Sequence, residues 1–598
     1  MTSASIGVQP GRFASSGLAR RLTDPALLLL PAAAFLAFIY LLPLIDLIRI
    51  SLGGPTWSIY FERVFAIPLY WDSLVRTMQI SVTVAFLCLL FGYPTALLIH
   101  RSRGIVQILI ATAIVLPYFI AILIRTYAWM VLLGRNGPVN KLLIAIGIIN
   151  EPVQLLFTRG TVLLGMTAVL LPLMVLSIYS SVARLDESLT RAALASGAGP
   201  IAVFWRVLLP LTLPGMGAGF LLVFVAALGF FITPTLLGGP GDQMFAMHIT
   251  QQADSVTSEG FLQALGVVLL GITLAVVAVA GRFLGFEFIW GGSKLSDAAP
   301  AKPETTGRRA GFGRRTLGTL LADLLGWPLL RLFGRLPASC GVWTVRVMGG
   351  LVIAVLTLPI IVVMIISFSS ASYLTFPPPG FSLRWYETFF ADSNWMLAFS
   401  NSLVVAAMSA CIAVALGTAA AMGIVRSSIR GKSTIMLLLV SPVIVPPVVL
   451  GLSLYSLFLR FDLVGTIFGL AAAHAIGGLP IVVVILSAAL QAVDPKLEQA
   501  AAVHGASSLT VFRTVILPAI APGLAAAAFF AFLHSFDELV LSLFLSSAQL
   551  KTLPLMLWAD VNYRLNPVLA VVSTLEVLLV VGGIVLARPV LARSREAV

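Results

Sequence analysis

About twelve long apolar runs dominate this sequence, and each is long enough to cross a lipid bilayer as a helix. Backbone N–H and C=O groups in hydrocarbon must be paired within their own segment, so the runs are predicted to be helices. Only 10% of the residues are charged and 59% are hydrophobic, which excludes an ordinary soluble protein. The runs lie near residues 26–49, 78–99, 105–131, 161–182, 212–237, 262–285, 345–367, 398–424, 434–459, 466–489, 520–545 and 565–587.

A set of special residues occurs twice at a constant offset of 308 positions, which indicates a tandem duplication. In each copy two alanines precede a glycine, an aliphatic residue and a Leu-Pro pair, in a polar loop after the fourth apolar run. The aligned pairs are Asp186 with Asp494, Ala192 with Ala500, Ala193 with Ala501, Gly197 with Gly505, Phe204 with Phe512 and Pro210 with Pro518. The predicted fold class is therefore an all-α integral membrane protein with two tandem six-helix domains.

We place the first membrane domain at residues 1–290, a linker at 291–343 and the second membrane domain at 344–598. Gly, Pro, Ala, Lys and Arg dominate the first part of the linker, and such a composition cannot bury a core. A cytoplasmic tether is therefore expected there. Because six is an even number, both halves enter the membrane in the same orientation, and a pathway is expected between them.

Each repeated loop is predicted to be a short helix–turn–helix. Asp494 is a good N-cap, and Pro495 stands at the first helical position, where its missing N–H costs nothing. Gly505 allows a turn that a residue with a Cβ resists, and a second short helix is expected to end at Leu517-Pro518. A compact motif with exposed apolar residues suits docking into a groove on a partner, although it could instead pack against its own bundle. The first copy repeats this plan with Asp186, Gly197, Phe204 and Pro210.

This repeated loop resembles the cytoplasmic coupling loop of ABC importer permeases, which docks onto an ATPase subunit. The chain departs from the family pattern in having Arg191 and Gln499, where the family usually has Glu before the two alanines. The resemblance extends over nearly all of both halves and points to the polyamine-type (spermidine/putrescine-like) branch. Its motifs stand at residues 123–129 (LIRTYAW), 236–240 (LLGGP), 377–382 (PPPGFS), 535–538 (SFDE) and 552–554 (TLP).

The resemblance implies two type I importer transmembrane domains, fused in one chain of a bacterial inner membrane. It also implies a separate ATPase subunit in two copies, which holds ATP and Mg²⁺, and a periplasmic substrate-binding protein. The chain itself would then be no enzyme and would bind no cofactor. A polyamine or a similar organic cation is the expected substrate, with opines, aminoethylphosphonate and ferric iron as alternatives. An ion-coupled secondary transporter would also have two parallel six-helix halves, but it would not predict the matched loops.

Basic residues in the short loops predict the orientation of the chain. Arg101 and Arg103 follow the second apolar run, and Arg426 and Arg430 follow its counterpart in the second half. By the positive-inside rule both repeated loops and both termini are cytoplasmic. The net charge of +13 is mostly this inside bias, so it does not indicate binding of nucleic acid.

Two adjacent carboxylates, Asp537 and Glu538, lie in the predicted fifth helix of the second half. At about 1.5 Å per residue they are roughly 25 Å from its cytoplasmic end. Charged residues within a span usually face a cavity, a partner or a solute route. We predict that they line the outer part of the substrate pathway, with Tyr127 and Trp129 as an opposite wall that makes cation–π contacts. Alternatively, Glu538 pairs with His534 on the same helix face.

Neither a metal site nor a catalytic site is predicted. The five histidines show no metal-ligand spacing, the three cysteines are spread along the chain, and no nucleophile with a nearby base is recognisable.

Overall fold

The computed structural model describes residues 25–253, 258–284, 338–373, 375–563 and 566–596. Most of the predicted linker, up to residue 337, lies outside the described residues, and its boundaries stay a prediction. Within the described residues the fold is helical, and β-type pairing is limited to one isolated bridge between Ser369 and Phe381.

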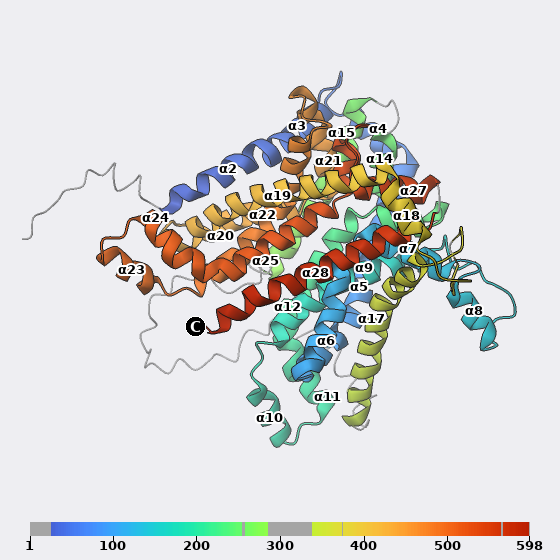
Figure 1. The fold of residues 1–598 in the computed structure, drawn as a ribbon, viewed down its shortest axis with the longest axis horizontal. Coiled ribbons are helices and arrows are strands. Elements are labelled where there is room, and N and C mark those ends of the chain that lie inside the picture. Colours follow the sequence, from blue (N-terminus) through green and yellow to red (C-terminus); the bar gives the residue numbers. More distant parts are fainter. Residues whose placement is uncertain (1–24, 254–257, 285–337, 374, 564–565, 597–598) are drawn as a thin grey trace, which may run out of the picture.

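The helices of the first half are arranged as the apolar runs predict, with short helices between the long ones (Figure 1). They are η1 (Pro25–Leu29), α2 (Leu30–Leu36), η2 (Ala37–Leu41), α3 (Leu42–Ser51), α4 (Ile59–Ala66), α5 (Pro68–Arg101), α6 (Gly104–Val115), η3 (Leu116–Phe119), α7 (Ile122–Leu133), α8 (Pro138–Ala145), α9 (Arg159–Val182), α10 (Glu187–Ala195), α11 (Pro200–Val203), η4 (Phe204–Leu208), α12 (Leu209–Leu228), α13 (Ile232–Leu237), η5 (Pro240–Asp242), α14 (Phe245–Ala253) and α15 (Glu259–Leu284).

The second half repeats this order from its first long helix onward. Its helices are α17 (Ala338–Ser367), α18 (Arg384–Ala391), α19 (Ser393–Arg426), α20 (Lys432–Val440), η7 (Ser441–Val443), α21 (Pro447–Arg460), α22 (Ile467–Gln491), α23 (Pro495–Val503), α24 (Ser508–Val511), η8 (Phe512–Ile516), α25 (Leu517–Phe536), α26 (Val540–Leu545), α27 (Leu553–Tyr563) and α28 (Val568–Glu596).

Nine helices among the described residues are long and apolar enough to cross a membrane unbroken, and two bent helix pairs bring the number to eleven. The last predicted run corresponds to the shorter apolar part of α28, Val568–Ile584. Large apolar side chains such as Phe38, Phe86 and Leu397 are exposed on the outer surface of these helices, where lipid would cover them. The prediction of helical apolar runs, six in each half, is therefore confirmed.

The third span of each half is broken, and the predicted single helices at 105–131 and 434–459 are wrong. In the first half the chain bends by 103° between Phe119 and Ile122, and in the second half by 90° between Val443 and Pro447. A proline explains the second break, because Pro447 pushes the preceding Pro446 out of the helical region, to a ψ of 131°. In the first half the residue before Pro117 stays helical, and the chain leaves the helix at Ile120 and Ala121. Pro117 lies in the short 3-10 helix η3, and Pro446 with Pro447 opens α21.

The fifth span of each half is broken too, so the predicted helices at 212–237 and 520–545 are wrong. Helix α12 ends at Leu228 and α13 begins at Ile232, while α25 ends at Phe536 and α26 begins at Val540. The equivalent residues Gly229 and Asp537 stand directly at these two breaks.

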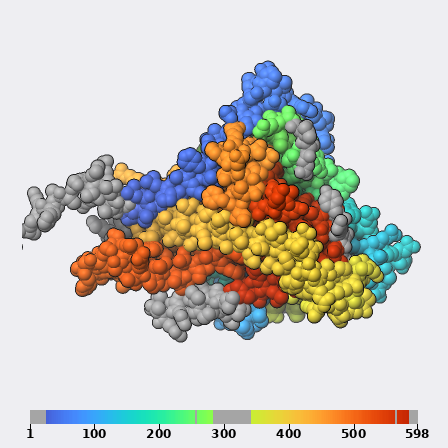
Figure 2. All heavy atoms as spheres, turned by 45° about the horizontal axis from the view of Figure 1, so that its top comes forward, coloured from blue at the N-terminus to red at the C-terminus, as the bar shows by residue number. Residues whose placement is uncertain are grey.

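The first span of each half packs against the other half. Helices η1 and α2 lie along α19, α3 packs on α21, and α17 lies against α5 and α7. Figure 2 shows the blue N-terminal helices resting on the yellow surface of the second half. One ion pair joins the halves here, because Arg460 Nη2 lies 2.9 Å from Asp46 Oδ2.

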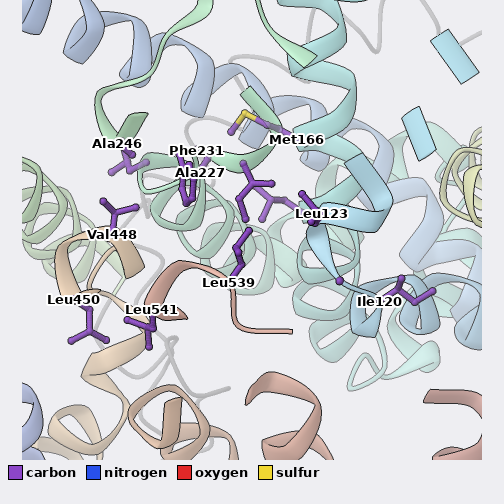
Figure 3. Close-up of a cluster of buried hydrophobic side chains, with 14 of the residues drawn as sticks. Ile120, Leu123, Met166, Ala227, Phe231, Ala246, Val448, Leu450, Leu539 and Leu541 are labelled. Carbon is purple, nitrogen blue, oxygen red and sulfur yellow. The ribbon is translucent and has the colours of Figure 1, made fainter. Parts of the chain in front are cut away.

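One apolar core runs through both halves at the level of the broken spans. Figure 3 shows Leu123 and Phe231 of the first half and Val448 and Leu539 of the second half in one cluster, to which Ile120, Leu450 and Leu541 also belong. All of these side chains are buried. The breaks in the third and fifth spans therefore meet at the interface between the halves.

Candidate functional site

The first candidate site is the pair of repeated loops, whose short helices begin as predicted. The Asp186 carboxylate caps α10 by accepting the Ser188 N–H at 2.8 Å, and the Asp494 carboxylate caps α23 by accepting the Lys496 N–H at 2.9 Å. Hydrogen bonds from the side chain and the backbone of Ser188 lower the pKa of the Asp186 carboxyl below its ordinary value. Asp186 is therefore ionised at neutral pH, and its negative charge stabilises the positive N-terminal end of the helix dipole of α10.

A glycine makes the turn in each loop. Gly197 has a φ of +82° and Gly505 a φ of +84°, so both adopt the left-handed conformation that a Cβ disfavours. A Cβ added to either would meet no heavy atom of this chain within 4 Å. The space beside each turn is therefore open to a partner, and the prediction of glycine turns is confirmed.

The predicted end of the second short helix at the Leu-Pro pair is wrong. In both copies the helix continues through a π-helical turn into the fifth span, past Pro210 and Pro518. The backbone N–H of Leu517 bonds to the carbonyl of Phe512, five residues earlier, and Leu209 bonds to Phe204 in the same way. This wider turn directly before the proline accommodates its missing N–H without ending the helix.

The first helix of each loop is largely exposed. Neither α10 nor α23 contains a buried residue, and Ala192 and Ala500 are exposed while Ala193 and Ala501 are half-buried. Apolar side chains project beside them, because Leu189, Leu497 and Val503 are 47%, 55% and 86% exposed. Figure 1 places α10 and α11 on the same side of the molecule as α23, α24 and the C-terminal end of α28.

The base of each loop is anchored to its own half. The Phe204 ring packs edge-on against Tyr93 of α5 with centroids 5.6 Å apart. In the second half Phe512 packs at the edge of the apolar core, and Arg426 of α19 pairs with Glu498 at 2.7 Å. The loops are therefore fixed at their base and exposed at their tip.

The second candidate site lies where the halves meet. The Asp537 carboxylate stands at the break after α25, beside the backbone amide of Ile122 at the start of α7. Glu538 Oε1 accepts the Leu541 N–H at 3.1 Å and so caps α26. The ion pairs of the described residues do not include one between Glu538 and His534. The prediction that both carboxylates lie within the fifth helix is wrong, because they lie in the break between α25 and α26. Both are partly exposed.

The structure places the two aromatic residues of the predicted pathway on different sides of α7. Tyr127 lines a small cavity toward α27 and α28, beside Leu557 and Ser573. Trp129 lines a second cavity toward α17, beside Pro359. Both side chains are buried, at 2% and 8% exposure, and the Tyr127 hydroxyl has no hydrogen-bond partner among the described residues.

Two charged residues at this interface were missing from the predicted site. Glu576 of α28 is 5% exposed and its Oε1 accepts the backbone N–H of Ala121 at 2.9 Å. Arg125 of α7 is 6% exposed, donates to the Val169 carbonyl at 3.2 Å and lies within electrostatic reach of Asp537 and Glu576. The sequence feature that could have identified Glu576 and Arg125 is that each is a single charged residue inside an apolar run.

A histidine bridges the break that carries Asp537. His474 of α22 is completely buried, and its Nδ1 lies 2.9 Å from the Ser535 hydroxyl on one side of the break. Its Nε2 lies 3.4 Å from the Ser542 hydroxyl on the other side. His474 therefore holds the ends of α25 and α26 together.

When the chain is compared with known protein families, one family model matches it twice, once in each half. A protein-family model described as "Binding-protein-dependent transport system inner membrane component" matches residues 27–286 and 413–588.

Two curated relatives are about equally similar. The spermidine/putrescine transport system permease protein PotB of Escherichia coli K12 is 33% identical over 220 residues, which are 36% of this chain and 80% of that protein. The putrescine transport system permease protein PotI of the same organism is 33% identical over 235 residues, 36% of this chain and 79% of that protein. A crystal structure of a bacterial alginate ABC transporter, in complex with alginate pentasaccharide-bound periplasmic protein, matches 45% of this chain and 93% of its own at 20% identity and a TM-score of 0.38.

Proposed function

Because the chain belongs to the family of binding-protein-dependent transport system inner membrane components, we propose that it is a transmembrane component of an ATP-driven importer. Each half supplies one permease domain, so a single chain replaces a pair of permease subunits. The observation that carries the proposal is the matched pair of exposed helix–turn–helix loops on one side of the molecule.

We infer that each loop docks onto one ATPase subunit, so that two copies of the ATPase bind the chain and hold the ATP and Mg²⁺. Exposed alanines and leucines around an open glycine turn support this role, because they offer an apolar surface that a partner's groove can cover. The loops and both termini then face the cytoplasm, as the basic residues near them favour. A periplasmic binding protein would deliver the substrate at the opposite face.

In each half one unbroken helix runs from the loop to the break in the fifth span, and it connects the loop mechanically to the interface. One apolar helix runs from Pro200 to Leu228 and another from Ser508 to Phe536, each of 29 residues. At about 1.5 Å per residue each is a rod of roughly 43 Å. Movement of a docked ATPase would thus reach Gly229 and Asp537, each of which lies at the bend of the other half's third span. Rigid-body rocking of the halves would then alternate access.

An organic cation of the polyamine type is the proposed substrate. Two similar relatives are named as spermidine/putrescine and putrescine permeases. Asp537 and Glu538 place two carboxyl groups at the interface, where an ammonium group passing between the halves would meet them. The two halves line the proposed pathway with different residues, because the first-half equivalents of Asp537 and Glu538 are Gly229 and Phe230.

The test is uptake by the whole assembly in proteoliposomes. The chain would be reconstituted with its ATPase and its binding protein, and uptake of labelled spermidine and putrescine would be measured with and without ATP. We expect uptake that requires ATP, ATPase and binding protein together. Uptake driven by a proton gradient with the chain alone would refute the importer. ATP-dependent uptake of other solutes, with neither polyamine transported, would refute the substrate class.

A further inference from the structure

Helix α7 begins at the interface without a cap of its own. The N-cap residue Ala121 has no side-chain acceptor, and Ile124, three residues later, cannot reach back to the Ala121 N–H as Glu does in a capping box. The first backbone N–H groups of a helix have no partner within it, and leaving them unpaired in an apolar interior is costly. The bend in the third span therefore creates donors that need acceptors from elsewhere.

The second half supplies these acceptors. Glu576 Oε1 accepts the N–H of Ala121 at 2.9 Å, and the Asp537 carboxylate lies against the N–H of Ile122. Glu576 thus does from across the interface what the Glu of a capping box does within a helix. Negative charge at a helix N-terminus is also favoured by the helix dipole.

The equivalent bend of the second half needs no such cap. Helix α21 opens with Pro446 and Pro447, which have no backbone N–H, and Gly229 of the first half packs directly on Pro446. A carboxylate is therefore present only on the side where the bend exposes N–H donors. This asymmetry indicates that Glu576 meets a hydrogen-bonding need of α7 and is not simply a buried charge.

Arg125 shows what the cap prevents. Its guanidinium lies one helical turn after Ala121 and is near Asp537, yet the ion pairs of the described residues do not join the two. The Arg125 Nε has no hydrogen-bond partner among the described residues. If the N-terminus of α7 moved, this unpaired donor would be available to the Asp537 carboxylate.

We propose that Glu576 is a positioning residue for the cation pathway, and this proposal rests on the proposed function. By capping α7 from the other half, Glu576 holds the bend so that Asp537 stays at the helix N-terminus and forms no direct ion pair with Arg125. Asp537 then stays placed to accept a hydrogen bond from an ammonium group of the substrate. The cap depends on the length of the Glu576 side chain and on its acceptor oxygen, and less on its negative charge.

Three substitutions separate reach from charge. Glu576→Gln keeps the length and an acceptor oxygen, Glu576→Asp keeps the charge but is one methylene shorter, and Glu576→Ala removes both. We expect Gln to retain a KM for spermidine uptake within about two-fold of the wild type. Asp and Ala should raise that KM about ten-fold, which corresponds to about 1.4 kcal/mol. The exposed Glu387 of α18, changed to Gln and to Asp, is the matched control and should leave KM unchanged.

Uptake kinetics would be measured on complexes that co-purify equally with the ATPase, and if the Ala variant does not assemble, the Gln and Asp variants still decide. A Gln variant as impaired as the Asp or Ala variant would overturn the proposal in favour of a charge requirement. Equal KM in all variants would also overturn it. Failure of the wild-type complex to import any polyamine would instead refute the proposed substrate.

Discussion

Replacing Gly505 by alanine places a Cβ in a turn with a φ of +84° and with no heavy atom of the chain within 4 Å. The cost is therefore conformational rather than steric, on the order of 1–2 kcal/mol for a residue held in the left-handed region. Such a cost shifts a local equilibrium by a factor of roughly 5–30. It acts on an exposed loop, so insertion and packing of the long helices should be unaffected.

Leucine at Gly505 adds bulk in the space where the ATPase is proposed to dock. We expect Gly505→Ala to weaken ATPase co-purification moderately and Gly505→Leu to abolish it. Gly505→Asn is the control, because Asn tolerates the left-handed conformation and should fall between wild type and Ala. The same series at Gly197, with a φ of +82°, should behave alike.

ATPase co-purification and ATP-dependent uptake would be measured at equal amounts of inserted chain. Leucine variants at both glycines that bind the ATPase and transport as well as the wild type would refute the docking role. A fall in membrane insertion that parallels the fall in uptake would show instead that the loops serve the fold.

Three further predictions concern the linker and the interface. Cutting the chain within residues 291–343 and co-expressing the halves should restore transport, with a loss due mainly to lowered effective concentration; inactivity of well-expressed halves would contradict a simple tether. Asp537→Asn should lower uptake of an organic cation at least ten-fold, and Glu538→Gln less, because Gln can still cap α26; undiminished uptake in both would favour an uncharged or anionic substrate. His474→Ala should lower both uptake and thermal stability, at roughly 0.6 kcal/mol per hydrogen bond lost between helices in a membrane. His474→Asn keeps a polar atom near the Nδ1 position and should retain more of both, and equal behaviour of the two variants would remove the bridging role.

Sequence patterns predicted the helical runs and the two repeated loops because those features depend on local chemistry. An apolar run must become a helix in lipid, and Asp494 before Pro495 starts a helix wherever it lies. The breaks were missed because the hydrophobic pattern continues through them. Proline signals were present at Pro117 and Pro446, but the same residue type at Pro210 and Pro518 does not stop a helix.

The interface site could be predicted only in part. Asp537 was visible as a charge in an apolar segment, but its position at the N-terminus of α7 depends on contacts between residues more than four hundred positions apart. Glu576 has no local motif, and its role follows from a backbone N–H at Ala121 that is free only because the third span bends. Contacts of this kind arise from tertiary packing and leave no periodic trace in the sequence.

The exchange of first spans between the halves has a consequence for biogenesis. Helices η1 to α3 leave the ribosome first, yet they rest on α19 and α21, which are made much later. At roughly 5–20 residues per second, synthesis of the chain from Ser51 to Arg460 takes on the order of 20–80 s. During this time the first span can pack only on its own half, chiefly on α15, and Asp46 pairs with Arg49 but not yet with Arg460. A helix satisfies its own backbone in lipid, so this waiting state is stable, and final assembly is a late event that closes both halves at once.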